Sequence, residues 1–322
     1  MTVAPVIDAL QFSNWNRARF EEWRAGGLDA VHVTIAYWED ARATLSAIGR
    51  WQRSFDAHAD LIRPATSGDD ILAAKGEGRT AVILGAQNCS PIEDELALVG
   101  VMRRLGLMVM QLTYNNQSLL GGGCYESEDA GITRFGREVI AEMNRHGVVI
   151  DLAHSAERTS LEAIEISSRP VAITHANPAR FRDSVRNKSD TLLRALAEAG
   201  GVLGFSLYPH HLAEGSRCPL EAFTAMVART VEAMGIDRVG IGSDLCRGWG
   251  PETLAWMRNG AWTFAEDDPP AWPAQPSWFR TPADMPALAG ALAARGFSAE
   301  EVGKIMGGNW FRLFAEGFEP QG

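Results

Sequence analysis

Eight short apolar segments constrain the fold of this chain more than any other feature. Each is nearly continuous in apolar residues, which is typical of strands buried on both faces of a parallel sheet. They are VIDALQF (6–12), AVHVTIA (30–36), TAVILGAQ (80–87), LMVMQLTY (107–114), VVIDLAH (148–154), PVAITHA (170–176), GVLGFSLY (201–208) and RVGIGSDL (238–245). Most of the intervals carry apolar residues at helical spacing, and only the first lacks a convincing helix. The expected helices are 39–60, 93–105, 134–146, 156–168, 189–199 and 219–234.

Strand and helix thus alternate eight times, which favours a closed (β/α)8 barrel over an open doubly wound sheet. No GxGxxG motif follows the first segment, so the usual dinucleotide-binding fold is excluded. We therefore expect an α/β fold with a single (β/α)8 TIM barrel domain over residues 1–322. Two further helices, at about 284–295 and 299–316, would close the barrel from outside, and the second should begin with a capping box of Ser298 and Glu301.

The composition changes after the last strand, over residues 249–286, which hold five tryptophans, seven prolines and the acidic run EDD at 266–268. We expect irregular chain here. A loop that leaves the last strand begins at the rim where barrel active sites lie, so it would cover the site. Its tryptophans can form an aromatic wall for a cationic or alkylated amine, or they can simply pack the loop onto the barrel. They are Trp249, Trp256, Trp262, Trp272 and Trp278.

Size and charge limit the classes of partner. A chain of 322 residues with 46% hydrophobic and 22% charged residues can bury a full core. Its 30 Lys and Arg against 40 Asp and Glu give a net charge of −10, which argues against nucleic acid or an anionic membrane and favours a small molecule. There is no membrane-spanning run and no signal-peptide pattern, so we expect a cytoplasmic protein. The four cysteines form no CxxC pair and are expected to be free thiols, and homo-oligomerisation is left open.

Polar residues stand at the ends of several of the expected strands, where the chemistry of a barrel takes place. His154 and His175 end consecutive strands, which would place two imidazoles at one level of the rim, as a pair of metal ligands requires. Each histidine alone would more often be a hydrogen-bonded structural residue, and Asp244 can be read as the cap of the following turn. One of His210 and His211, in a loop, can reach the pocket. The strand-end residues are Gln87, Asn88, Tyr114, His154, His175, Tyr208 and Asp244.

Three segments resemble the membrane (renal) dipeptidase family of metallopeptidases. They are GITRFGREVIAEMNRHGVVIDLAHSAERT, SSRPVAITHANPARFRDSVRNKSDTLLRALAEAGGVLGF and VGIGSD, and they agree with the family in order and spacing. The resemblance implies a (β/α)8 barrel of the metal-dependent hydrolase type, which in this family holds two zinc ions and hydrolyses dipeptides. It further implies that His154 and His175 match two ligands of one zinc, Arg186 the group that binds the substrate carboxylate, and Asp244 the acid/base near the scissile bond.

The chain departs from the family at other ligand positions. The family's His-x-Asp pair on the first strand is replaced by Leu10 and Phe12, neither of which binds a metal. The bridging glutamate falls at Gln87, and the substrate-facing histidine at Tyr114. A binuclear zinc centre needs carboxylates and three to four protein ligands for each ion. We therefore expect a reduced centre that holds one zinc ion or none, and not the full binuclear centre.

Three functions stay open from the sequence. The first is a dipeptidase-like hydrolase that acts on a small carboxylate-bearing amide or dipeptide-like substrate, with Asp244, His154 and Tyr114 as catalytic residues. Its substrate would contact Arg186, Tyr208, Gln87 and Asn88, and one zinc would bind His154 and His175. The second is a metal-free barrel enzyme or small-molecule-binding protein for a carboxylate-bearing, cationic amine ligand. The third is a non-catalytic binding or assembly protein.

Arg186 also has an ordinary alternative reading, a surface salt bridge with Asp183 or Asp190.

Overall fold

The computed structural model of the chain describes residues 4–260 and 271–321. Its strands form one parallel sheet in the order β10-β1-β2-β4-β5-β6-β7-β8-β9, with β3 added beside β4. The strands are β1 (Ile7–Ser13), β2 (Ala30–Ala36), β3 (Ile62–Pro64), β4 (Thr80–Ala86), β5 (Leu107–Gln111), β6 (Val149–Asp151), β7 (Ala172–Ala176), β8 (Val202–Phe205), β9 (Val239–Ile241) and β10 (Leu245–Arg247).

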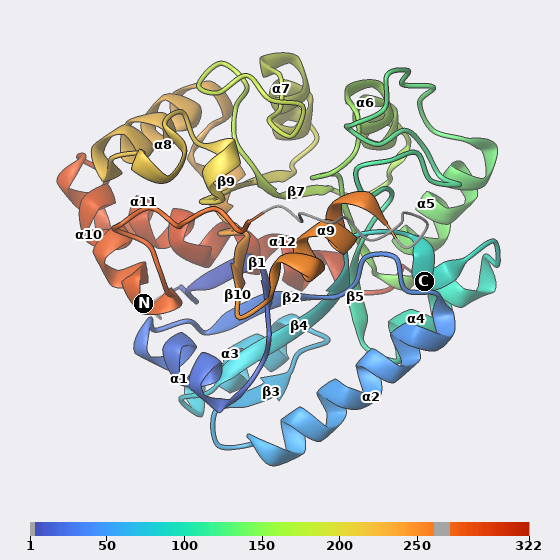
Figure 1. Cartoon of the computed structure of the whole chain (residues 1–322), viewed down its shortest axis with the longest axis horizontal. Helices are drawn as coiled ribbons and strands as arrows, with labels where there is room; N and C mark the ends of the chain where they lie inside the picture. Colours follow the sequence, from blue (N-terminus) through green and yellow to red (C-terminus); the bar gives the residue numbers. More distant parts are fainter. Residues whose placement is uncertain (1–3, 261–270, 322) are drawn as a thin grey trace.

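The sheet closes because its last segment pairs in two directions. β9 pairs with β8, and a few residues later β10 pairs with β1, with Gln11 opposite Leu245. Each of the eight predicted strand segments thus carries a strand or, for 238–245, the start of this two-part strand. The architecture is the expected (β/α)8 barrel, with its helices around the strands (Figure 1).

The helices follow the strands in the order that a barrel requires. They are α1 (Arg17–Ala25), α2 (Ala41–Ala57), α3 (Gly68–Gly76), α4 (Ala97–Arg104), α5 (Arg134–His146), α6 (Glu157–Ile166), α7 (Asp190–Glu198), α8 (Leu220–Met234), α9 (Pro251–Asn259), α10 (Met285–Ala294), α11 (Ala299–Gly303) and α12 (Asn309–Gly317). Short 3-10 turns cover Ser90–Ile92, Pro209–His211, Gly215–Arg217, Ile236–Arg238 and Pro282–Asp284, and a π-helical turn, Lys304–Gly308, joins α11 to α12.

Side-chain caps fix where several of these helices begin. Asp40 accepts a hydrogen bond from the Ala43 N–H at the start of α2, and Thr133 and Ser189 cap α5 and α7 in the same way. Each such cap satisfies a backbone donor that the first helical turn leaves unpaired. The predicted capping box of Ser298 and Glu301 is confirmed at α11.

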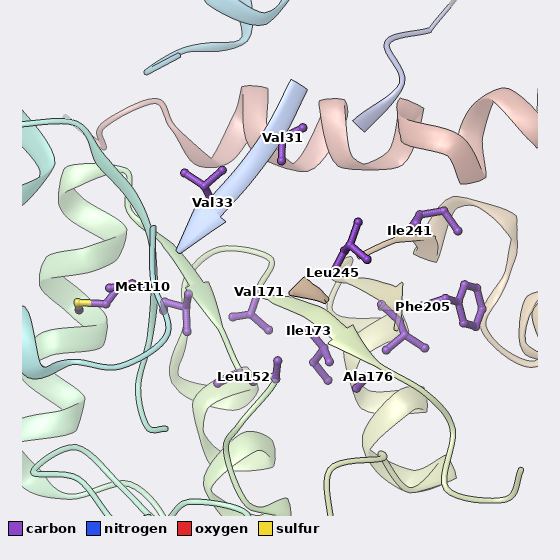
Figure 2. Close-up of a cluster of buried hydrophobic side chains, with 14 of the residues drawn as sticks. Val31, Val33, Met110, Leu152, Val171, Ile173, Ala176, Phe205, Ile241 and Leu245 are labelled. Atoms are coloured by element: carbon purple, nitrogen blue, oxygen red, sulfur yellow. The ribbon is translucent and has the colours of Figure 1, made fainter. Parts of the chain in front are cut away.

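The main hydrophobic cluster lies between the strands and the surrounding helices. Figure 2 shows part of it, with Val31 and Val33 on β2 and side chains from the opposite side of the barrel, such as Ile173 and Phe205. Strands buried on both faces need apolar residues at successive positions, which explains the continuous runs of the sequence.

A second cluster closes the N-terminal end of the barrel, where α12 packs across the strands. The Trp310 indole is fully buried and donates its Nε1–H to the Ile241 carbonyl at 3.0 Å. A Cβ on Gly240 would lie 2.3 Å from that nitrogen, so a glycine is required there. The opposite, C-terminal end of the strands is left for the site.

The structure corrects the sequence interpretation in three places. The first interval does hold a helix, α1, which buries Phe20 and Trp23. β3 and α3 divide the next connection. Within 249–286, predicted to be irregular, α9 forms with Gly250 as its N-cap and Pro251 in its first turn, a favourable position for proline. Trp262 and the acidic run 266–268 lie outside the described residues. The single-domain organisation and the covering loop stay predictions.

All four cysteines are unpaired, as predicted. In the described part of the chain, no helix combines the length and the hydropathy that a membrane crossing requires.

Candidate active site

A pocket opens at the C-terminal ends of the strands, and α9 forms part of its lining. Six of the predicted residues line it: Gln87, Tyr114, His154, Arg186, Tyr208 and Asp244. His210 and His211 line it as well, whereas His175 lies fully buried beneath it. Parallel strands end at one rim, so residues far apart in the sequence meet there.

His154 and His175 face each other, and their Nε2 atoms are 3.0 Å apart. Hydrogen bonds to the other ring nitrogens hold both rings. The Asn115 amide oxygen lies 2.7 Å from His154 Nδ1, and the Thr174 hydroxyl lies 2.7 Å from His175 Nδ1. Thr174 in turn donates to the buried Asp151 carboxyl at 2.5 Å. Burial lowers the pKa of both histidines well below the usual value, and the Arg186 charge lowers it further, so both are neutral at neutral pH.

Arg186 reaches into this pair and is not a surface residue. Only 6% of it is exposed, and its Nη2 lies 3.0 Å from His154 Nε2 while its Nη1 donates to the Ala153 carbonyl. Asp190 pairs with Arg180 instead, so the alternative of a surface salt bridge to Asp190 is wrong. No carboxylate among the described residues forms an ion pair with Arg186, and its guanidinium faces the pocket.

Asp244 is held in an unusual backbone conformation at the pocket wall. Its φ is +56°, in the left-handed region that aspartate tolerates better than most residues. Its side chain accepts no hydrogen bond from the described residues. Burial raises the pKa of Asp244 from 3.8 to about 7, with Arg186 opposing the rise. This carboxyl can therefore gain or lose a proton near neutral pH, as a general acid or base must.

Tyr114 and Gln87 line the wall between β4 and β5. The Tyr114 ring packs on His154, with ring centres 4.2 Å apart, and burial raises the pKa of its phenol well above the usual range. The Gln87 amide nitrogen donates to Thr34 at 2.8 Å and to the Tyr37 hydroxyl at 3.0 Å. The Tyr114 phenol therefore keeps its proton. On Gln87, whose amide nitrogen is already hydrogen-bonded, the amide oxygen is left to bind a ligand.

Asn88, like His175, is a predicted site residue that does not line the pocket. Its amide oxygen accepts from the Cys89 N–H at 2.9 Å, so it stabilises its own turn. Leu10 is fully buried, and the Phe12 ring stacks on Trp249, with centres 4.9 Å apart. The end of β1 is therefore apolar and aromatic.

The donor set does not fit a binuclear zinc centre. Among residues 4–260 and 271–321, no three His, Cys, Asp or Glu side chains converge on one point. Catalytic zinc sites use three protein ligands for each ion. In addition, His154 Nε2, one of the two nitrogens that would bind a metal, already lies within hydrogen-bond distance of the positively charged Arg186.

Comparison with known proteins supports the same family that the sequence segments indicated. The family model described as "Membrane dipeptidase (Peptidase family M19)" matches residues 9–255. The chain belongs to the membrane dipeptidase family. The resemblance stated from the sequence is thereby confirmed.

Two solved structures and one curated protein illustrate the relationship. An amidohydrolase from Pseudomonas aeruginosa is 34% identical, with a TM-score of 0.92 over 98% of this chain and 97% of its own. A metallopeptidase from Rhodobacter sphaeroides, liganded with a phosphinate mimic of the dipeptide L-Ala-D-Ala, is 18% identical with a TM-score of 0.81, covers 97% of this chain and 99% of its own, and shares the fold. Dipeptidase tcpJ of Claviceps purpurea is 24% identical over 291 residues, 89% of this chain and 62% of that protein. The chain thus spans less than two thirds of that relative's length.

The structure also brings to the pocket residues that the sequence did not single out. Asn115 follows a strand end and orients His154, and Arg258 and Leu254 come from α9. Trp272 lines the pocket, whereas Trp278 packs on Phe223 of α8. The tryptophans of 249–286 therefore include both a pocket residue and a packing residue.

Proposed function

We propose that this chain is a dipeptidase-like hydrolase that acts on a small amide carrying a carboxylate. Its centre holds one zinc ion or none. One observation carries the proposal: the buried guanidinium of Arg186, which forms no ion pair with a carboxylate of the described residues, lines the same pocket as a carboxyl whose pKa is about 7. Family membership and the relatives named as dipeptidases support the same reaction class.

Arg186 is the anchor for the substrate carboxylate. It offers planar N–H donors, and a charge-assisted pair of this kind contributes about 1.5–3 kcal/mol. Because the guanidinium is held by His154 and by the Ala153 carbonyl, its orientation is set before the ligand arrives.

Asp244 and Tyr114 perform the proton chemistry. Asp244 takes the proton of the attacking water and returns it to the leaving amine, which its pKa of about 7 suits. The protonated Tyr114 phenol donates to the substrate carbonyl oxygen, on which negative charge develops. His154, packed against Tyr114, orders this wall of the pocket. Gln87 and Tyr208 complete the wall that contacts the substrate.

The centre holds one zinc ion at most. A single zinc on His154 and His175 would require Arg186 to leave His154 Nε2, so we favour a centre that works without metal. Elemental analysis of the purified protein, with and without added zinc, tests this. Two ions per chain would overturn the proposal. One ion per chain would show that Arg186 can leave His154 Nε2 to a metal.

A second candidate, a protein that binds a carboxylate-bearing ligand without turnover, is favoured by the loss of ligand residues at Leu10, Phe12 and Gln87. A dipeptide panel separates the two. We expect slow hydrolysis, below the ordinary enzyme range of about 1–1,000 per second. Binding with no turnover would favour the second candidate. A cytoplasmic location, the absence of membrane and nucleic-acid partners, and any homo-oligomer stay proposals based on the sequence.

A further inference from the structure

A second arginine, Arg258 of α9, lines the same pocket as Arg186. Its Nη2 lies 3.5 Å from the Tyr208 hydroxyl and 3.5 Å from His210 Nδ1, at the outer limit of a hydrogen bond. No carboxylate among the described residues pairs with it. By contrast, Arg247, which is also partly buried, forms an ion pair with Glu22.

The position of Arg258 is set by the packing of α9. Leu254 and Arg258 are four residues apart, hence on one face of the helix, and both line the pocket. The Trp38 indole donates to the carbonyls of Trp256 and Met257 at 3.1 and 3.2 Å, which fixes the last turn of the helix. The guanidinium is therefore presented to the pocket by a fixed element.

The described lining of the pocket is positively charged, although the chain as a whole is acidic. It carries two arginines against one carboxyl, Asp244. Burial lowers the pKa of His154, His210 and His211, so the histidines of the lining add no charge at neutral pH. A cationic pocket in a chain of net charge −10 concentrates anionic ligands locally.

We propose that the substrate carries two carboxylates, one bound by Arg186 and the second by Arg258, so that it is a small amide with an acidic side group. This inference rests on the proposed function and adds the substrate class. A simple dipeptide is zwitterionic and would leave one guanidinium unpaired in a partly buried site, where an unpaired charge is costly. A second carboxylate provides the missing partner.

Matched ligands that differ only in charge test the inference. We would measure binding by calorimetry and kcat/KM for Ala-Glu against Ala-Gln and for Glu-Ala against Gln-Ala, because the acidic group can lie on either side of the amide. The wild-type chain should favour the acidic member of one pair by about tenfold or more. Arg258→Gln should bring that ratio close to one. Arg258→Lys should keep part of the preference.

Arg229→Gln is the matched control, since Arg229 is an exposed residue of α8 that pairs with Glu232 and does not line the pocket. It removes the same charge and should leave the ratio as in the wild type. Equal affinities for acidic and neutral members in the wild type, or a preference that survives in Arg258→Gln, would overturn the inference and leave the proposed function standing. If neither member of either pair binds to the wild type or is hydrolysed by it, both this inference and the proposed function are wrong.

Discussion

Replacement of Asp244 by asparagine tests the proton-transfer role that we assign to this residue. The two side chains have nearly the same size, and asparagine adopts the left-handed φ of +56° as readily as aspartate does. The substitution therefore removes the titrating proton with little strain. Asp244→Ala provides a control for the backbone, because alanine in this region costs about 1–2 kcal/mol at every pH.

The expected effect on stability follows from the pKa. Burial raises the pKa of Asp244 from 3.8 to about 7, so the folded protein binds this proton more tightly than the unfolded chain does. Wild-type stability should therefore fall as the pH rises from about 4 to about 7, and a difference of this size corresponds to at most about 4 kcal/mol. Since the side chain is partly open to the pocket, we expect about 1–3 kcal/mol. The free energy of unfolding of Asp244→Asn should not show this decrease, so the variant should become more stable relative to the wild type as the pH rises from about 4 to about 7.

Urea unfolding at a series of pH values, for wild type, Asp244→Asn and Asp244→Ala, measures this difference. The two variants lack the general base, so their kcat should be about 100- to 10,000-fold lower than that of the wild type. The wild-type kcat/KM should rise with pH up to about 7. Parallel stability curves for wild type and Asp244→Asn would refute the raised pKa. An unchanged kcat would refute the catalytic role.

Two further predictions concern Arg186 and the closed end of the barrel. Arg186→Lys keeps the positive charge but loses the planar pair of N–H donors, so carboxylate ligands should bind about 10- to 100-fold more weakly in calorimetry. The weakened contacts to His154 and Ala153 should also lower the free energy of unfolding by about 1 kcal/mol. An unchanged ligand affinity would show that Arg186 is not in the site. Gly240→Ala should destabilise by about 1–3 kcal/mol through overpacking against Trp310, whereas Gly290→Ala, a helix position with no heavy atom within 4 Å of an added Cβ, should stabilise by about 0.5–1 kcal/mol. Equal melting temperatures for the two glycine variants would contradict the packing argument.

The sequence predicted the barrel because its eight strand segments are nearly continuous in apolar residues. That pattern depends only on burial on both faces, which the barrel imposes on every strand. It did not predict α1 and α9, which are nine residues each and draw their stability from tertiary contacts such as the burial of Phe20 and Trp23. Short helices of this kind give a weak periodic signal.

The site was predictable to the extent that it consists of strand ends. His154, His175 and Asp244 could be placed at one rim because parallel strands end together. Asn88 also follows a strand end, one residue after Gln87. Its amide oxygen accepts a hydrogen bond from the Cys89 N–H, so its side chain stabilises the turn and does not line the pocket. Arg258 could not be predicted, because its place depends on how Trp38 holds the end of α9. The burial of Arg186 is likewise a property of loop packing.

Charge balance links the altered ligand positions to Arg186. A zinc ion brings two positive charges, and the resemblance implies that Leu10, Phe12 and Gln87 stand in the places of family ligands. The neutral imidazoles of His154 and His175 would then bind it, with no carboxylate among the described residues converging on them. A buried dication without anionic ligands is strongly disfavoured. A guanidinium brings a single charge, is weakly hydrated, and binds through fixed donors to acceptors such as His154 Nε2 and the Ala153 carbonyl. The same donors remain able to bind a substrate carboxylate, whose charge then completes the balance. On this argument, restoring a carboxylate at this one position, as Gln87→Glu, should draw Arg186 toward the new negative charge and weaken ligand binding in calorimetry, without creating a zinc site.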